Sequence, residues 1–246
     1  MNDALTAGTI SITGLGGDEI EAYLAHPLGD GPFGSVVVIH HLPGYDEPTK
    51  EIVRRFASRG YATLMPNLHH RDAPGASPDD AAAASRANGG VPDDRLVGDV
   101  GAAASYLRAM DGSNGKVGVI GYCSGGRQSF LAACSLSLDA AVDCYGAAVV
   151  TAPEGLPVPM KPIMGLAKDL SCPLLGLFGA DDKYPAPAET AEMDKILTEL
   201  GKEHEFHTYD GAGHAFFSVN RPSYRVDAAN DGWEKIWDFY GRLLAS

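Results

Sequence analysis

Cys123 lies in a segment whose sequence is typical of an enzyme nucleophile. The segment GYCSGG (121–126) places a glycine two residues before and two residues after Cys123, between the apolar run KVGVI and a stretch with helical spacing. A sharp turn from a strand into a helix strains the backbone of the residue at the turn. It also brings the backbone so close together that a side chain two residues before or after that residue would clash with it, which explains the two glycines. The turn holds the sulfur at the N-terminus of a helix, where partial positive charge favours thiolate. The pattern predicts that Cys123 attacks acyl carbons while the Ser124 N–H faces the developing oxyanion.

Two later motifs supply a carboxylate and a histidine, in the chain order that this type of nucleophile requires. GADDKYP (179–185) follows an apolar run and offers Asp181 or Asp182 in the turn that leaves the sheet. DGAGHAFF (210–217) follows the last predicted strand and contains His214 in a glycine-rich loop. We interpret the three groups as nucleophile, acid and base, although a buried cysteine, a turn aspartate and a loop histidine could also be unrelated.

Apolar runs alternate with helical patterns along the chain, which predicts a mostly parallel sheet with helices on both faces. The first two strands are expected to form a hairpin, and active sites in such sheets lie beyond the carboxyl ends of the strands. The expected strands are 9–13, 19–27, 35–41, 61–66, 116–122, 138–146, 172–179 and 203–209. The expected helices are 48–60, 93–110, 125–134, 187–200 and 230–244. The sequence therefore predicts an α/β-hydrolase fold, in a single domain over residues 1–246.

Two segments fit neither pattern. Residues 72–92 are small, polar and rich in glycine and proline, and residues 151–171 contain four prolines that exclude a long helix. Both follow strands, so both are candidates for the rim of a pocket or for a lid, and otherwise for surface connections.

The net charge of −13 disfavours nucleic acid and anionic membrane surfaces as partners, because both require clusters of basic residues. No apolar run is long enough to span a membrane, and the N-terminus does not resemble a secretion signal, so we expect a cytoplasmic protein. The other cysteines, Cys134, Cys144 and Cys172, form no CxxC pair and are expected to be small buried hydrophobes.

The chain resembles the dienelactone hydrolase family of α/β-hydrolases from about residue 8 to the C-terminus. The resemblance rests on GYCSGG, GADDKYP, YDGAGHAFF and the framework segments RGYATLMPNLHHR and KVGVIGY. It implies that a Cys-His-Asp triad opens an enol lactone without a cofactor, and that the backbone N–H groups of Leu42 and Ser124 hold the oxyanion. The family spacing after the strand-ending glycine selects Asp182 over Asp181.

The sequence departs from the family pattern at two places near the expected site. Family members that act on free dienelactone have a glutamate just before the first oxyanion donor, where this chain has His41. They also have an arginine shortly after the catalytic histidine, where this chain has residues 215–218, AFFS. The triad is compatible with both changes, but the particular substrate need not be conserved.

Four histidines follow two adjacent predicted strands, as the pairs 40–41 and 69–70. A metal site there is conceivable, but no acidic residue joins them at a ligand spacing, and we expect no metal. In the alternative that we favour, His40 packs in the sheet while the second pair lines or caps the pocket. Arg71 and Arg86 could bind an anionic end of the substrate, although surface ion pairs are the more ordinary role. The expected substrate pocket comprises His41, His70, Arg71, Tyr122 and Phe216.

The sequence thus predicts a hydrolase that opens a lactone or cleaves a small activated ester, acting as a monomer or small homo-oligomer. One alternative is a general carboxylesterase or thioesterase with the same triad. Another is a non-catalytic ligand-binding protein with this fold, which the presence of every catalytic residue type disfavours.

Overall fold

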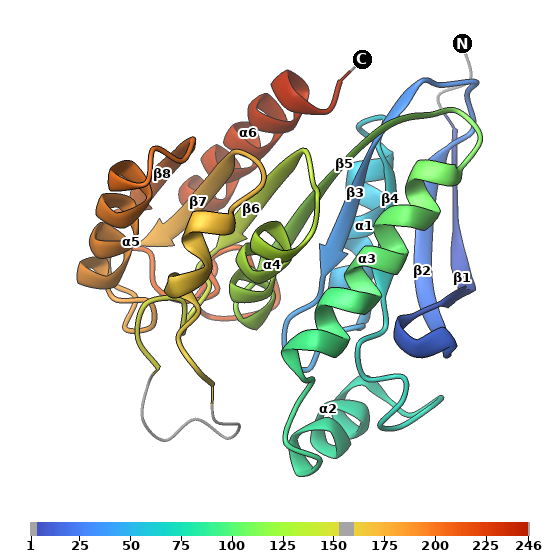
Figure 1. The fold of residues 1–246 in the computed structure, drawn as a ribbon, viewed down its shortest axis with the longest axis horizontal. Helices are drawn as coiled ribbons and strands as arrows, with labels where there is room; N and C mark the ends of the chain where they lie inside the picture. Colours follow the sequence, from blue (N-terminus) through green and yellow to red (C-terminus); the bar gives the residue numbers. More distant parts are fainter. Residues whose placement is uncertain (1–3, 153–159, 246) are drawn as a thin grey trace.

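A single eight-stranded sheet organises the computed structural model, which describes residues 4–152 and 160–245 (Figure 1). The strand order is β1-β2-β4-β3-β5-β6-β7-β8, and all pairs from β4 to β8 are parallel. The β1–β2 and β2–β4 pairs are antiparallel. The strands are β1 Leu5–Thr13, β2 Glu19–Pro27, β3 Phe33–Ile39, β4 Ala62–Pro66, β5 Ser113–Tyr122, β6 Ala140–Cys144, β7 Leu174–Gly179 and β8 His204–Tyr209. This arrangement confirms the predicted α/β-hydrolase fold.

Helices cover both faces of the sheet (Figure 1). Helices α3, α4 and α5 pack on one face, and α1 and α6 pack on the other. Strand β3 shows why both faces are apolar: Val37 and Ile39 point to the first face while Val36 and Val38 point to the second, and all four are fully buried. The helices are α1 Glu47–Ala57, α2 Pro78–Ala87, α3 Asp93–Ala109, α4 Ser124–Ser135, α5 Pro187–Glu199 and α6 Val226–Leu243, with short 3₁₀ turns at Leu15–Gly17 and Met164–Asp169.

The expected strands and helices are present, and the differences are at their ends and in the unassigned segments. Segment 72–92 is not all loop, because it contains helix α2. The Ser77 hydroxyl accepts a hydrogen bond from the Asp80 N–H, Pro78 begins the helix, and a run of alanines continues it. In segment 151–171, residues 153–159 lie outside the described part, and the described remainder contains only the second 3₁₀ turn. Across the described residues, no helix combines the length and the apolar character needed to cross a membrane.

Candidate active site

The turn from β5 into α4 gives Cys123 a strained backbone. Its φ of 57° and ψ of −120° lie in a region that residues with a side chain rarely adopt. A Cβ at position 121 would lie 1.8 Å from the Gly125 carbonyl oxygen, and a Cβ at position 125 would lie 2.4 Å from the Ile39 carbonyl oxygen. The turn therefore requires both glycines that the sequence pattern singled out, and it presents the half-buried Cys123 side chain above the sheet.

Asp182 and His214 meet at the carboxyl end of the sheet. The Nδ1 atom of His214 lies 2.9 Å from Oδ2 of Asp182, whose other oxygen accepts a hydrogen bond from the Tyr184 N–H. Asp182 is buried, whereas the neighbouring Asp181 is exposed. Of the two candidates that the residues alone left open, the structure brings Asp182 to the histidine.

The imidazole of His214 lies between Asp182 and Cys123. Burial alone would lower the pKa of His214, but hydrogen bonds with Asp182 and Cys123, together with their negative charge, raise it to about 10. The ring is thus placed to exchange a proton with the sulfur on one side and is oriented by a carboxylate on the other.

A cavity of about 600 Å³ opens above these three side chains. Leu42 and Ser124 line it beside Cys123. The Leu42 N–H has no hydrogen-bond partner among the described residues, and Ser124 begins α4, where N–H groups have no partner within the helix. The Cys123 N–H is unavailable, because it donates to the Cys144 carbonyl. The predicted oxyanion donors are therefore placed at the wall of the cavity.

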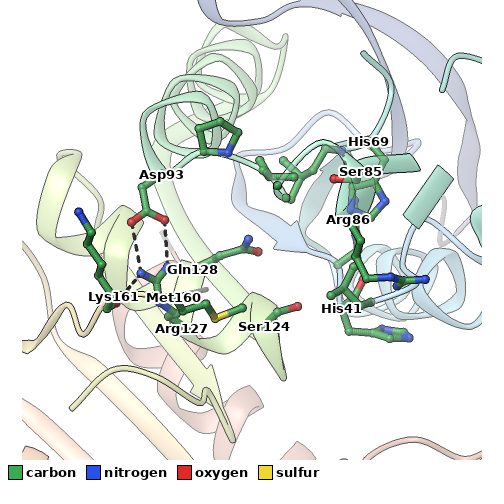
Figure 2. Close-up of a pocket in the computed structure, with 17 residues that line it drawn as sticks. His41, His69, Ser85, Arg86, Asp93, Ser124, Arg127, Gln128, Met160 and Lys161 are labelled. Atoms are coloured by element: carbon green, nitrogen blue, oxygen red, sulfur yellow. Dashed lines mark hydrogen bonds and ion pairs between the residues drawn. The ribbon is translucent and has the colours of Figure 1, made fainter. Parts of the chain in front are cut away.

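A smaller cavity of about 270 Å³ adjoins the first and shares Leu42, Ser124, Arg86 and Met160 with it (Figure 2). Arg86 has no ion-pair partner among the described residues. Arg127 differs, since its guanidinium pairs with Asp93 and donates to carbonyl oxygens, as Figure 2 shows for Lys161. Arg127 therefore ties α4 to α3, whereas the guanidinium of Arg86 remains available to a ligand.

The histidine pairs form no metal cluster within the described chain. The Nδ1 of His40 lies 3.0 Å from the His41 carbonyl oxygen, and its Nε2 accepts from the Leu68 N–H. Burial lowers the pKa of His40 to about 3 and that of His69, which packs edge-on against it, to about 4. Both rings are therefore neutral at physiological pH. They pack against each other after β3 and β4, and His69 also lines the smaller cavity, as predicted for one member of the second pair.

The predicted substrate-pocket residues are placed unevenly. His41 lines the smaller cavity, and its Nε2 lies 3.4 Å from a carboxylate oxygen of Asp46, a neighbour that the sequence analysis missed. His70 lines neither cavity. Tyr122 and Phe216 are buried in the aromatic core on the α6 face and line neither cavity.

The prediction for Arg71 as a pocket residue is wrong. Its guanidinium donates to Asp18 and to the fully buried Asp99, and so joins the turn before β2 to helix α3. A buried carboxylate requires a charged partner, which fixes this arginine in the scaffold.

Asp143 is a buried carboxyl group that the sequence analysis did not single out. It lies on β6 beneath the first turn of α4, where Oδ1 accepts from the Gly146 N–H at 2.7 Å and Oδ2 has no partner among the described residues. Burial raises the pKa of Asp143 to about 7. The one available signal was an acidic residue inside the otherwise apolar run AAVDCYG.

Replacing Asp143 with asparagine should stabilise the protein above neutral pH. The folded-state pKa of Asp143 exceeds the ordinary value of 3.8, so its ionisation destabilises the fold progressively as pH rises from about 4 through 7. Asparagine keeps an acceptor for Gly146 and cannot ionise. The measurement is urea unfolding of both proteins at pH 5 and pH 8. The free energy of unfolding should be higher for the variant, by more at pH 8 than at pH 5, and on the order of 2–4 kcal/mol at pH 8. A difference independent of pH would contradict this account.

Comparisons with known proteins identify relatives along most of this chain. The model of the dienelactone hydrolase family matches residues 20–244. A protein of Escherichia coli (strain K12), provisionally named a carboxymethylenebutenolidase, is 35% identical over 97% of this chain and 88% of its own length. The carboxymethylenebutenolidase of Pseudomonas putida is 31% identical over 97% of this chain and 98% of its own.

A solved structure from Klebsiella pneumoniae subsp. pneumoniae MGH 78578, provisionally titled a dienelactone hydrolase, superposes with a TM-score of 0.85 at 30% identity. The alignment covers 97% of this chain and 99% of the other. The family match spans all but the first residue of β2, every strand from β3 to β8 and all the residues of the candidate site. The chain is a hydrolase of the dienelactone hydrolase family.

Proposed function

We propose that the protein opens a lactone or cleaves a small activated ester through an acyl-enzyme on Cys123. His214 takes the thiol proton, and the sulfur attacks the acyl carbon while the Leu42 and Ser124 N–H groups bind the oxyanion. The alcohol or enol oxygen leaves with the proton from His214. Water then attacks the acyl-enzyme, gives its proton to His214 and releases the acid, while Asp182 holds the imidazole in one orientation.

The contact of His214 with both Cys123 and Asp182 is the observation that carries this proposal. The sulfur contributes to the raised pKa of His214, so forming the acyl-enzyme removes that contribution and lets the neutral imidazole act as base toward water. An amine is a poorer leaving group than the thiolate of Cys123, so the tetrahedral intermediate formed from an amide tends to return to the reactants. Activated acyl groups such as enol lactones and thioesters therefore suit this nucleophile better than amides do.

The lining of the cavity supports a small acyl group with an anionic end. Leu42, Ala147, Met160 and Tyr184 surround the space above Cys123, while the unpaired guanidinium of Arg86 lies at the border with the smaller cavity. A carboxylate on the substrate would find its charge partner there.

Mass spectrometry of the protein mixed rapidly with p-nitrophenyl acetate tests the acyl-enzyme. We expect a mass increase of one acetyl group, located on Cys123 after digestion, and its decay at the rate of steady-state hydrolysis. A panel of lactones, oxygen esters and thioesters then ranks the substrate classes. Turnover without acetylation of Cys123 would contradict the mechanism, and acetylation that never decays would favour a binding protein.

His41 should influence the reactivity of Cys123. It precedes the oxyanion donor Leu42 and stands where the resemblance implies a glutamate, and a carboxylate at that position would repel thiolate. The variant His41→Glu should therefore react more slowly with iodoacetamide at neutral pH, and its alkylation profile should shift to higher pH. The comparison is the pH dependence of Cys123 alkylation in both proteins. Identical profiles would mean that His41 serves only in packing against Asp46 and Thr49.

A further inference from the structure

A third cavity lies on the opposite face of the molecule from helix α3, between α1 and the loop 217–220, and we call it the α1 groove. Its volume is about 650 Å³, in the range of sites for small organic ligands. Neither Cys123 nor His214 lines it, so it is separate from the catalytic cavity. Nothing in the proposed reaction uses it.

The floor of the α1 groove is aromatic. Tyr122, Tyr145, Phe217 and Trp233 form it, with ring centroids 5.6 Å apart for Tyr122 and Phe217 and 5.7 Å apart for Phe217 and Trp233. Each of the four rings is between 1% and 7% exposed, so only a small part of each reaches the groove, and these parts together favour a flat apolar or aromatic ligand. The two departures from the family pattern, at His41 and Ser218, also line the groove.

One cation of the α1 groove has no acid partner. The Arg55 guanidinium lies 4.4 Å from the centre of the Trp233 ring and forms no ion pair with any residue of the described ranges. It lies close enough to the floor for its charge to act on the buried Tyr122 hydroxyl. A guanidinium stacked on an indole still directs its N–H groups outward, toward a carboxylate.

The acidic residues of the α1 groove do not neutralise Arg55. Glu47 and Glu51 both pair with Arg54, and their side chains are 72% and 68% exposed. The lining thus contains two carboxylates and two guanidiniums, and Arg55 is the one of these four groups with no ion pair among the described residues, which leaves its N–H groups available to an anionic ligand.

We propose that the α1 groove is a binding site for an aromatic carboxylate. The ring of the ligand lies on the aromatic floor, and its carboxylate pairs with Arg55. Because the Tyr145 ring also packs 5.1 Å from the ring of His214, the bound ligand contacts a residue that touches the base. The proposal does not depend on the proposed reaction.

The test is calorimetric titration of 2-naphthoate into protein whose Cys123 has been alkylated with iodoacetamide, which inactivates the nucleophile and takes up part of the catalytic cavity. We expect one saturable site. Arg55→Gln should weaken binding by about tenfold or more, the effect of losing a charged hydrogen bond. The neutral 2-naphthamide should bind wild type as weakly as 2-naphthoate binds this variant.

Arg59→Gln is the matched control, because Arg59 lies 5.2 Å over the neighbouring Trp237 but does not line the α1 groove. This variant should bind 2-naphthoate with nearly wild-type affinity. No saturable binding, equal affinities for wild type and Arg55→Gln, or an equal loss in Arg59→Gln would each overturn the proposal. Arg55 is exposed, so its replacement leaves the fold intact.

Discussion

Cys123→Ala should lose lactone and ester hydrolysis by a factor on the order of 10⁵ to 10⁶, as when a nucleophile is removed from other triads. The variant keeps the cavity, the oxyanion donors and the His214–Asp182 pair, so substrate affinity should change little. The measurement is kcat with the best substrate of the panel, with circular dichroism to verify the fold. Cys123→Ser should keep weak esterase activity, because the turn can present a hydroxyl in place of the sulfur.

The other three cysteines provide internal controls. Burial raises the pKa of Cys134 and of Cys172 to about 12, and raises that of Cys144 as well. Iodoacetamide should therefore label Cys123 first, in step with the loss of activity. Cys172→Ala is the matched variant and should remain active. Cys172 is half-buried like Cys123, but it precedes the amino end of β7, at the opposite end of the strands from the site. Full activity in Cys123→Ala would refute the mechanism.

The elements that position the site could be predicted from the sequence because each has a strong local signal. β-Branched runs such as 36–39 indicate buried parallel strands, and Gly121 and Gly125 mark a turn that tolerates no side chain. The order of nucleophile, acid and histidine then follows from the order of strand ends along the chain. The buried strands and the glycine turn depend on residue spacing within one segment, and the order of the triad depends on the order of segments along the chain, so the sequence contains both kinds of information.

The pocket could not be predicted in the same way, because it depends on where side chains point once distant segments have packed. Arg71 follows a strand at the correct edge, yet it faces Asp99, a residue 28 positions later whose buried carboxylate had no sequence signal. Tyr122 is next to the nucleophile, but alternation along β5 turns its ring into the core on the α6 face, where it lines neither cavity of the site. Helix α2 was missed because the glycines and prolines of 72–92 flank a helical alanine run rather than interrupt it.

Asp182→Asn should reduce kcat by about four powers of ten at neutral pH, with a small effect on KM. The Asp182 carboxylate accepts the Nδ1–H of His214 and so keeps Nε2 directed at the sulfur. An asparagine side chain can offer its N–H₂ group to Nδ1, which stabilises the opposite tautomer. It also removes a negative charge that raises the pKa of His214, so that pKa should fall, and NMR titration of the ring would detect the fall.

Asp181→Asn separates this role from a general effect of charge near the site. Asp181 lines the same cavity and carries the same charge, but its side chain is exposed and forms no hydrogen bond with His214. Its replacement should change kcat by no more than about twofold, since exposed charges at this distance are screened by solvent. If Asp181→Asn were the more damaging change, the acid of the triad would be the neighbouring residue. Because Asp182 contacts His214 directly at 2.9 Å, the two variants should differ by at least three powers of ten in kcat, on the order expected for a residue that fixes the tautomer.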